Sequence, residues 1–166
     1  MALFDGFEGL KFFSLYGLIA AVIIVIPNFI FAKKGQETRP EDLDTAGARV
    51  CTLELLSRTA LSIVLVCMRF PVIYPLYGIL AGVALLIYYG LWVRYFKGGY
   101  YYPDIYLKSF LGIPVPIDTF NIVYFCLVSL WLCNIVALCL TIVYGTCRML
   151  NAHAALKDLK CRELQA

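Results

Sequence analysis

The chain has 166 residues, of which 62% are hydrophobic and 15% are charged, and its formal net charge is +3. Soluble domains contain about 25% charged residues, and a chain this short cannot bury so much apolar surface in one globular core. The composition therefore favours a membrane protein. It gives no support to nucleic-acid binding, because the basic residues form neither a stripe nor a recognition motif.

Residues 12–32 form an uncharged stretch that we interpret as the first membrane span. Its length matches the roughly 20 residues that cross a bilayer. Pro27 and Asn28 interrupt it near its end. Because proline has no backbone N–H, the carbonyl four residues earlier needs another partner. We expect either a kink capped by Asn28 or a polar notch that faces the second span.

Residues 33–49 are a polar loop with four basic and four acidic residues. Membrane orientation follows lysine and arginine rather than net charge, so this loop is predicted to be cytoplasmic. The N-terminus is then predicted to lie outside.

The second predicted span, residues 50–70, carries Glu54 and Arg58 within an apolar stretch. An intramembrane charge is costly and usually faces protein, a partner charge or water. The two residues are four apart with the acid first, which favours a pair on one helix face. Such a pair is typical of helix packing, and a ligand or ion site is the alternative.

Residues 76–96 form the third predicted span. Gly78 and Gly82 have the small-xxx-small spacing that lets helices approach closely. The span ends in tyrosines, Trp92, Arg94 and Lys97, an aromatic belt followed by positive charge that is typical of the cytoplasmic leaflet.

Residues 110–150 hold only one acid, Asp118, and one base, Arg148. They fit two spans, 110–131 and 133–150, with a turn at Cys133 and Asn134, or one long tilted helix with Asp118 as its N-cap. Two spans place the basic C-terminal residues on the cytoplasmic side, although no glycine or proline marks the turn.

We therefore predict an all-α, polytopic transmembrane helix bundle with five spans, four being the alternative. The N-terminus is expected outside, and residues 151–166 form a short polar cytoplasmic tail. In this arrangement Asn28, Glu54, Arg58 and Asp118 lie at similar depths, roughly 6–12 Å below the inner surface at 1.5 Å per residue. Our hypothesis is that these four form one ligand-binding polar cluster between spans one, two and four.

Three segments carry a resemblance: SLYGLIAAVIIVIPNFIFAKK at residues 14–34, LELLSR at residues 53–58 and, more loosely, LGIPVP at residues 111–116. The chain resembles a group of small uncharacterised integral membrane proteins of Firmicutes with about five spans. The resemblance implies a bacterial inner-membrane location. It implies no activity, because that group has none to carry over, and the residues from Asn151 onward depart from it.

The sequence contains no phosphate loop, nucleophile elbow or zinc-protease motif, and its seven cysteines have no metal-site spacing. We expect no catalytic residues, no metal and no cofactor, and whether the chain is an enzyme stays open. The expected partners are the lipid bilayer and either further copies or another membrane subunit. Three interpretations remain: a small transport or solute-binding subunit, an accessory protein whose buried charges specify packing, and a lipid-modifying enzyme.

Overall fold

The computed structural model describes residues 13–34, 39–40, 43–67 and 74–165, and this part of the chain is helical with no strand. The predicted all-α helix bundle is confirmed. Its elements are α1 (Leu15–Lys34), α2 (Ala48–Cys67), α3 (Pro75–Lys97), α4 (Asp104–Leu107), α5 (Pro116–Trp131) and α6 (Ile135–Gln165).

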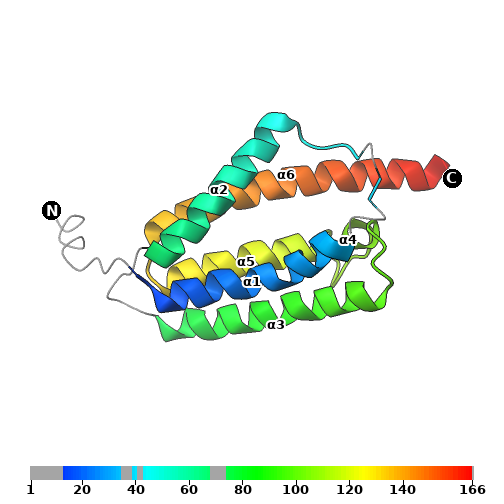
Figure 1. Cartoon of the computed structure of the whole chain (residues 1–166). Helices are drawn as coiled ribbons and strands as arrows, with labels where there is room; N and C mark the ends of the chain where they lie inside the picture. Colours follow the sequence, from blue (N-terminus) through cyan, green and yellow to red (C-terminus); the bar gives the residue numbers. More distant parts are fainter. Residues whose placement is uncertain (1–12, 35–38, 41–42, 68–73, 166) are drawn as a thin grey trace.

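The long helices run back and forth along the bundle in alternating directions, so α1, α3 and α6 end at the same end of it (Figure 1). Helix α3 packs along α5, α5 along α6, and α6 along α2, while α1 contacts α2, α3 and α5. Helix α2 crosses α6 obliquely (Figure 1). It is the most exposed of the long apolar helices, since only 17% of its most apolar 18-residue segment is buried.

Four helices, α1, α2, α3 and α6, are long and apolar enough to cross a membrane. Helix α5 is also apolar, but its 16 residues span only about 24 Å. Helix α6 has 31 residues and a length of about 46 Å, which exceeds the roughly 30 Å of a bilayer's hydrocarbon core. It continues without a break through residues 151–165, which we had assigned to a polar tail, and buries Ala152, Ala155, Leu156 and Leu159 there.

A turn separates α5 from α6 at the predicted place, although no glycine is present. Cys133 adopts the left-handed conformation, with φ 51°. The side-chain oxygen of Asn134 then accepts a hydrogen bond from the backbone N–H of Ala137 at 2.9 Å. This is the arrangement of a helix N-cap, so Asn134 starts α6.

Pro27 leaves the carbonyl of Ile23 without its usual intrahelical donor. The hydroxyl of Tyr89 in α3 donates to that oxygen at 2.6 Å. The polar notch in α1 therefore faces α3, and not the second span that we had considered. Two further tyrosines reach α1 carbonyls in the same way: Tyr88 donates to Ile24 at 3.3 Å and Tyr124 to Ala20 at 3.1 Å.

Close approach of α1 and α2 depends on Gly17. A Cβ atom at this position would lie 1.8 Å from the backbone oxygen of Leu65. Nearby, the backbone N–H of Ser14 donates to the carbonyl of Val66 at 2.8 Å. Of the two glycines with small-xxx-small spacing, Gly78 packs against the Trp131 ring, whereas Gly82 faces open space.

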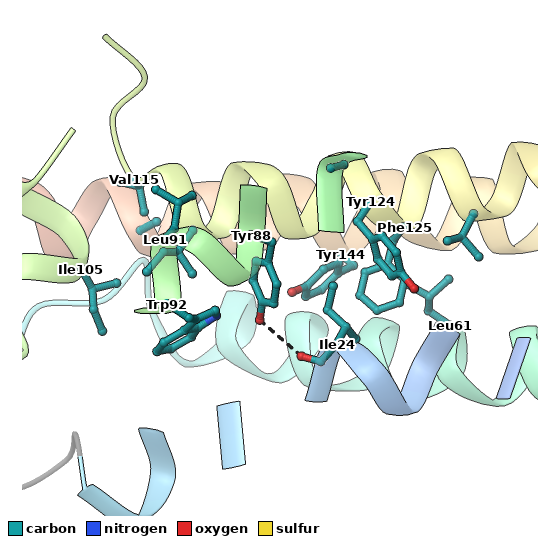
Figure 2. Close-up of a cluster of buried hydrophobic side chains, with 14 of the residues drawn as sticks. Ile24, Leu61, Tyr88, Leu91, Trp92, Ile105, Val115, Tyr124, Phe125 and Tyr144 are labelled. Atoms are coloured by element: carbon teal, nitrogen blue, oxygen red, sulfur yellow. Dashed lines mark hydrogen bonds between the residues drawn. The ribbon is translucent and has the colours of Figure 1, made fainter. Parts of the chain in front are cut away.

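The core is aromatic as well as aliphatic. Figure 2 shows the Tyr88 hydroxyl pointing toward the Ile24 backbone, with the Tyr144, Tyr124 and Phe125 side chains gathered nearby. Tyr88 and Tyr144 are almost completely buried. A buried tyrosine normally finds a hydrogen-bond partner for its hydroxyl, and here Tyr88 uses the α1 backbone, which ties α1 to α3.

Candidate functional site

Arg148 in α6 joins two acids from different helices. Its Nε and Nη2 atoms lie 2.8 and 2.7 Å from Oδ1 of Asp118 in α5, and its Nη1 atom lies 3.1 Å from Oε1 of Glu54 in α2. The Asp118 side chain is 3% exposed and that of Glu54 13%. A buried charge is costly unless an opposite charge lies beside it. The contacts of Arg148 with Asp118 and Glu54 provide that compensation for all three groups.

Asn151 lies one turn after Arg148 and completes the cluster. Its Nδ2 atom donates to Oε2 of Glu54 at 2.6 Å. Its Oδ1 atom accepts the backbone N–H of Ala46 at 3.2 Å and faces the Cys51 thiol at 3.6 Å. Asn151 therefore holds the carboxylate of Glu54 and also ties the loop before α2 to α6.

The structure brings together two of the four residues in the predicted cluster, Glu54 and Asp118, and it does so through Arg148. Asn28 lies elsewhere: its Nδ2 atom donates to the carbonyl of Ile24 at 3.0 Å and to the Tyr88 hydroxyl at 3.1 Å. Arg58 is exposed and its guanidinium makes no ion pair or hydrogen bond with any described residue. The expected Glu54–Arg58 pair is replaced by Glu54–Arg148.

Sequence reasoning missed Arg148 and Asn151 as members of the site. Arg148 is the one base within the apolar stretch at residues 110–150, and Asp118 is its one acid. This lone pair of opposite charges was a usable signal, because two charges placed in apolar surroundings are expected to find each other. Asn151 gave no comparable signal, since it falls among polar residues at the end of the chain.

A polar cavity of about 230 Å³ lies over this cluster. It is bounded by the loop before α2, by α2 itself, by the end of α1, by the segment around α4 and by α6. Its lining includes charged side chains, aromatic rings and an amide: Phe31, Arg39, Asp44, Glu54, Tyr102, Tyr106, Arg148 and Asn151.

The aromatic wall of the cavity already holds a positive group. The guanidinium of Arg39 lies over the Tyr102 ring, 5.9 Å from the ring centroid. The hydroxyls of Tyr102 and Tyr106 lie 3.4 Å apart. Burial, and the negative charge of Asp118 nearby, raise the pKa of the Tyr106 phenol. That phenol therefore stays protonated and neutral at physiological pH.

The charged side chains that line the cavity include two carboxylates. Arg39 and Arg148 contribute two positive charges to the lining and Asp44 and Glu54 two negative ones, while the buried Asp118, which pairs with Arg148, does not line the cavity. Each oxygen of Glu54 has one donor in the described structure. A carboxylate can accept about four hydrogen bonds, so Glu54 retains capacity toward the cavity. Among the described residues, no group of three or more His, Cys, Asp or Glu side chains is placed to hold a metal ion.

Comparison with family models, curated proteins and solved structures found no match to this chain.

Proposed function

We propose that the chain is a multi-pass membrane protein whose polar cavity binds a small organic cation. The observation that carries the proposal is the cavity of about 230 Å³ in which aromatic rings and the carboxylates of Asp44 and Glu54 face the same space. Aromatic faces and carboxylates together form the usual recognition site for ammonium groups. A water molecule occupies about 30 Å³ of liquid, so this cavity has room for a solute of several heavy atoms.

Arg39 supports this choice of ligand class. It shows that the Tyr102 ring accepts a cation in the folded protein. A ligand ammonium could take the same position once the Arg39 side chain moved aside. Glu54, held by Arg148 and Asn151, would then supply the fixed negative charge.

We place the cavity at the cytoplasmic end of a bundle in the cell membrane. Lysine and arginine concentrate at the helix ends that surround it, including Lys33 and Lys34 of α1 and Arg94 and Lys97 of α3. This distribution follows the positive-inside rule. A bacterial inner membrane and a role as a transport or solute-binding subunit agree with these features and belong to the same proposal.

Choline is a suitable probe, and its neutral isostere 3,3-dimethylbutan-1-ol tests for the charge. We expect the purified protein in nanodiscs to bind choline at least tenfold more tightly than the isostere, measured by calorimetry. Glu54→Gln should abolish this preference, whereas Glu163→Gln, at an exposed acid outside the cavity, should preserve it.

The aromatic wall has its own matched pair of variants. Tyr102 lines the cavity, whereas its neighbour Tyr101 is 54% exposed and does not. Tyr102→Leu should weaken choline binding about tenfold and Tyr101→Leu should not change it. Equal binding of choline and the isostere, or binding unaffected by Glu54→Gln and Tyr102→Leu, would overturn the proposed ligand class.

A second candidate is an accessory membrane protein whose charges specify packing. It is favoured by the complete pairing of the Arg148 guanidinium, whose three nitrogens all contact the acids of α2 and α5. On this alternative Glu54→Gln lowers stability but no cation binds in the cavity.

A further inference from the structure

Arg58 lies near the middle of α2, a helix long and apolar enough to span a membrane. Ten residues separate it from Ala48 at one end and nine from Cys67 at the other, which corresponds to about 14–15 Å in each direction. An arginine side chain can snorkel toward an interface when it lies near a helix end. From this position in a spanning helix it reaches neither interface.

The Arg58 side chain is also exposed, and no acid among the described residues pairs with it. Glu54, one turn earlier, is held by Arg148 and Asn151 instead. A single arginine at the centre of a bilayer is costly, so such residues normally face a partner.

The surface around Arg58 is more polar than a lipid-facing surface needs to be. Thr52 and Thr59 are exposed on the same side of α2, two turns apart, and Ser62 is half-buried one turn after Arg58. The hydroxyls of Thr52, Thr59 and Ser62 each donate to the carbonyl four residues earlier. Small hydroxyl residues of this kind are typical of interfaces between membrane helices.

A second copy of the chain does not provide the missing charge. Among the described residues, the acids within the apolar stretches of the helices are Glu54 and Asp118, and both are already paired with Arg148. The acids of α6, Asp158 and Glu163, lie beyond its apolar half and far from mid-membrane depth. A symmetric contact through α2 would instead place two Arg58 side chains close together. Like charges that meet in a low-dielectric interface repel each other strongly.

We propose that this face of α2, formed by Thr52, Leu55, Arg58, Thr59 and Ser62, docks a transmembrane helix of another protein that carries a carboxylate at mid-membrane depth. The guanidinium of Arg58 would pair with that carboxylate in a charge-assisted hydrogen bond, and the hydroxyl residues would let the two helices approach. The proposal rests on the membrane location but is independent of the cation-binding cavity.

Designed peptides test it directly. Oligoleucine transmembrane helices with a central Glu, Gln or Leu would carry an acceptor fluorophore, and the protein would carry a donor at its C-terminus. In phosphatidylcholine vesicles at pH 8, energy transfer should show that the Glu peptide associates at least tenfold more strongly than the Gln and Leu peptides. Arg58→Leu should remove this preference.

Arg49→Leu is the matched control. Arg49 is also an exposed arginine of α2, but it lies at the first turn and not at mid-depth. This variant should keep the preference for the Glu peptide. Arg58→Leu removes an exposed charge from an apolar helix, so thermal unfolding should show a folded protein.

Several outcomes would overturn the proposal. Equal association with all three peptides would show that the Arg58 guanidinium needs no carboxylate partner in the bilayer. An unchanged preference for the Glu peptide in Arg58→Leu would show that the peptide contacts another part of the protein. Self-association between donor- and acceptor-labelled protein that depends on Arg58 would identify a second copy as the occupant. A protein that carbonate extracts from the vesicles would instead refute the membrane location itself.

Discussion

The Nε atom of Arg148 lies 2.8 Å from Oδ1 of Asp118, so the single acid of α5 and the single base in the apolar half of α6 form one ion pair. Asp118 is almost completely buried. Breaking a buried pair by removing one partner is typically destabilising by about 3–5 kcal/mol, because the other charge is left uncompensated.

We therefore expect Asp118→Asn to lower the midpoint of thermal unfolding in detergent by far more than Asp104→Asn. Asp104 pairs with Lys108, whose side chain is 49% exposed, and such pairs contribute about 0–1 kcal/mol. The triple variant Glu54→Gln, Asp118→Leu and Arg148→Met, which removes all three charges of the cluster, should recover much of the loss. An Asp118→Asn protein as stable as Asp104→Asn would contradict the pairing.

Tyr89→Phe should destabilise the protein by about 1–3 kcal/mol, because it leaves the half-buried Ile23 carbonyl without its hydrogen-bond donor. The matched background is Pro27→Ala, which restores a backbone N–H that can reach Ile23. In that background the same substitution should cost less than about 1 kcal/mol. Thermal unfolding of the four proteins measures the difference, and an equal loss in both backgrounds would refute this role of Tyr89.

Gly17→Ala should separate α1 from α2, since its methyl group would lie 1.8 Å from the Leu65 oxygen. We expect a drop of several degrees in the unfolding midpoint. Gly82→Ala is the control, because a Cβ atom there meets nothing within 4 Å. Alanine also has the higher helix propensity, by about 1 kcal/mol, so this control should be neutral or stabilising. Identical behaviour of the two variants would argue against the close contact.

Reporter fusions test the orientation in the membrane. The C-terminal ends of α1 and α6 lie at the same end of the bundle (Figure 1). A two-compartment reporter placed after Lys34 and after Ala166 should therefore report cytoplasm in both cases. Opposite results would mean that α5 and α6 do not both cross the bilayer.

The helical bundle was predictable because its causes are local. Apolar runs of about 20 residues, broken by polar or proline-containing segments, fix where helices begin and end. The turn at Cys133 and Asn134 was also predictable, and the reason it needs no glycine lies in Asn134, whose side chain caps α6. The need of the Ile23 carbonyl for a partner likewise followed from Pro27.

The partners across helices were not predictable in the same way. Glu54 and Arg58 have the right spacing for an intrahelical pair, but such pairs contribute only about 0.3–0.5 kcal/mol. The packing of α2 on α6 offers Glu54 a stronger contact with Arg148 and Asn151, and the rotation of α2 leaves Arg58 exposed. That rotation depends on contacts along whole helices, including Gly17 against Leu65.

The sequence by itself determined that this chain forms apolar helices, where they are interrupted and which charges had to be accommodated. Only the tertiary structure decided that Asp118 and Glu54 share Arg148, that Asn28 bonds to Tyr88, and that Arg58 faces outward. The physical reason is that helix formation is set within a few residues of the chain. The choice of a charge's partner is set by which helix faces pack together, and burial makes that choice a strong one.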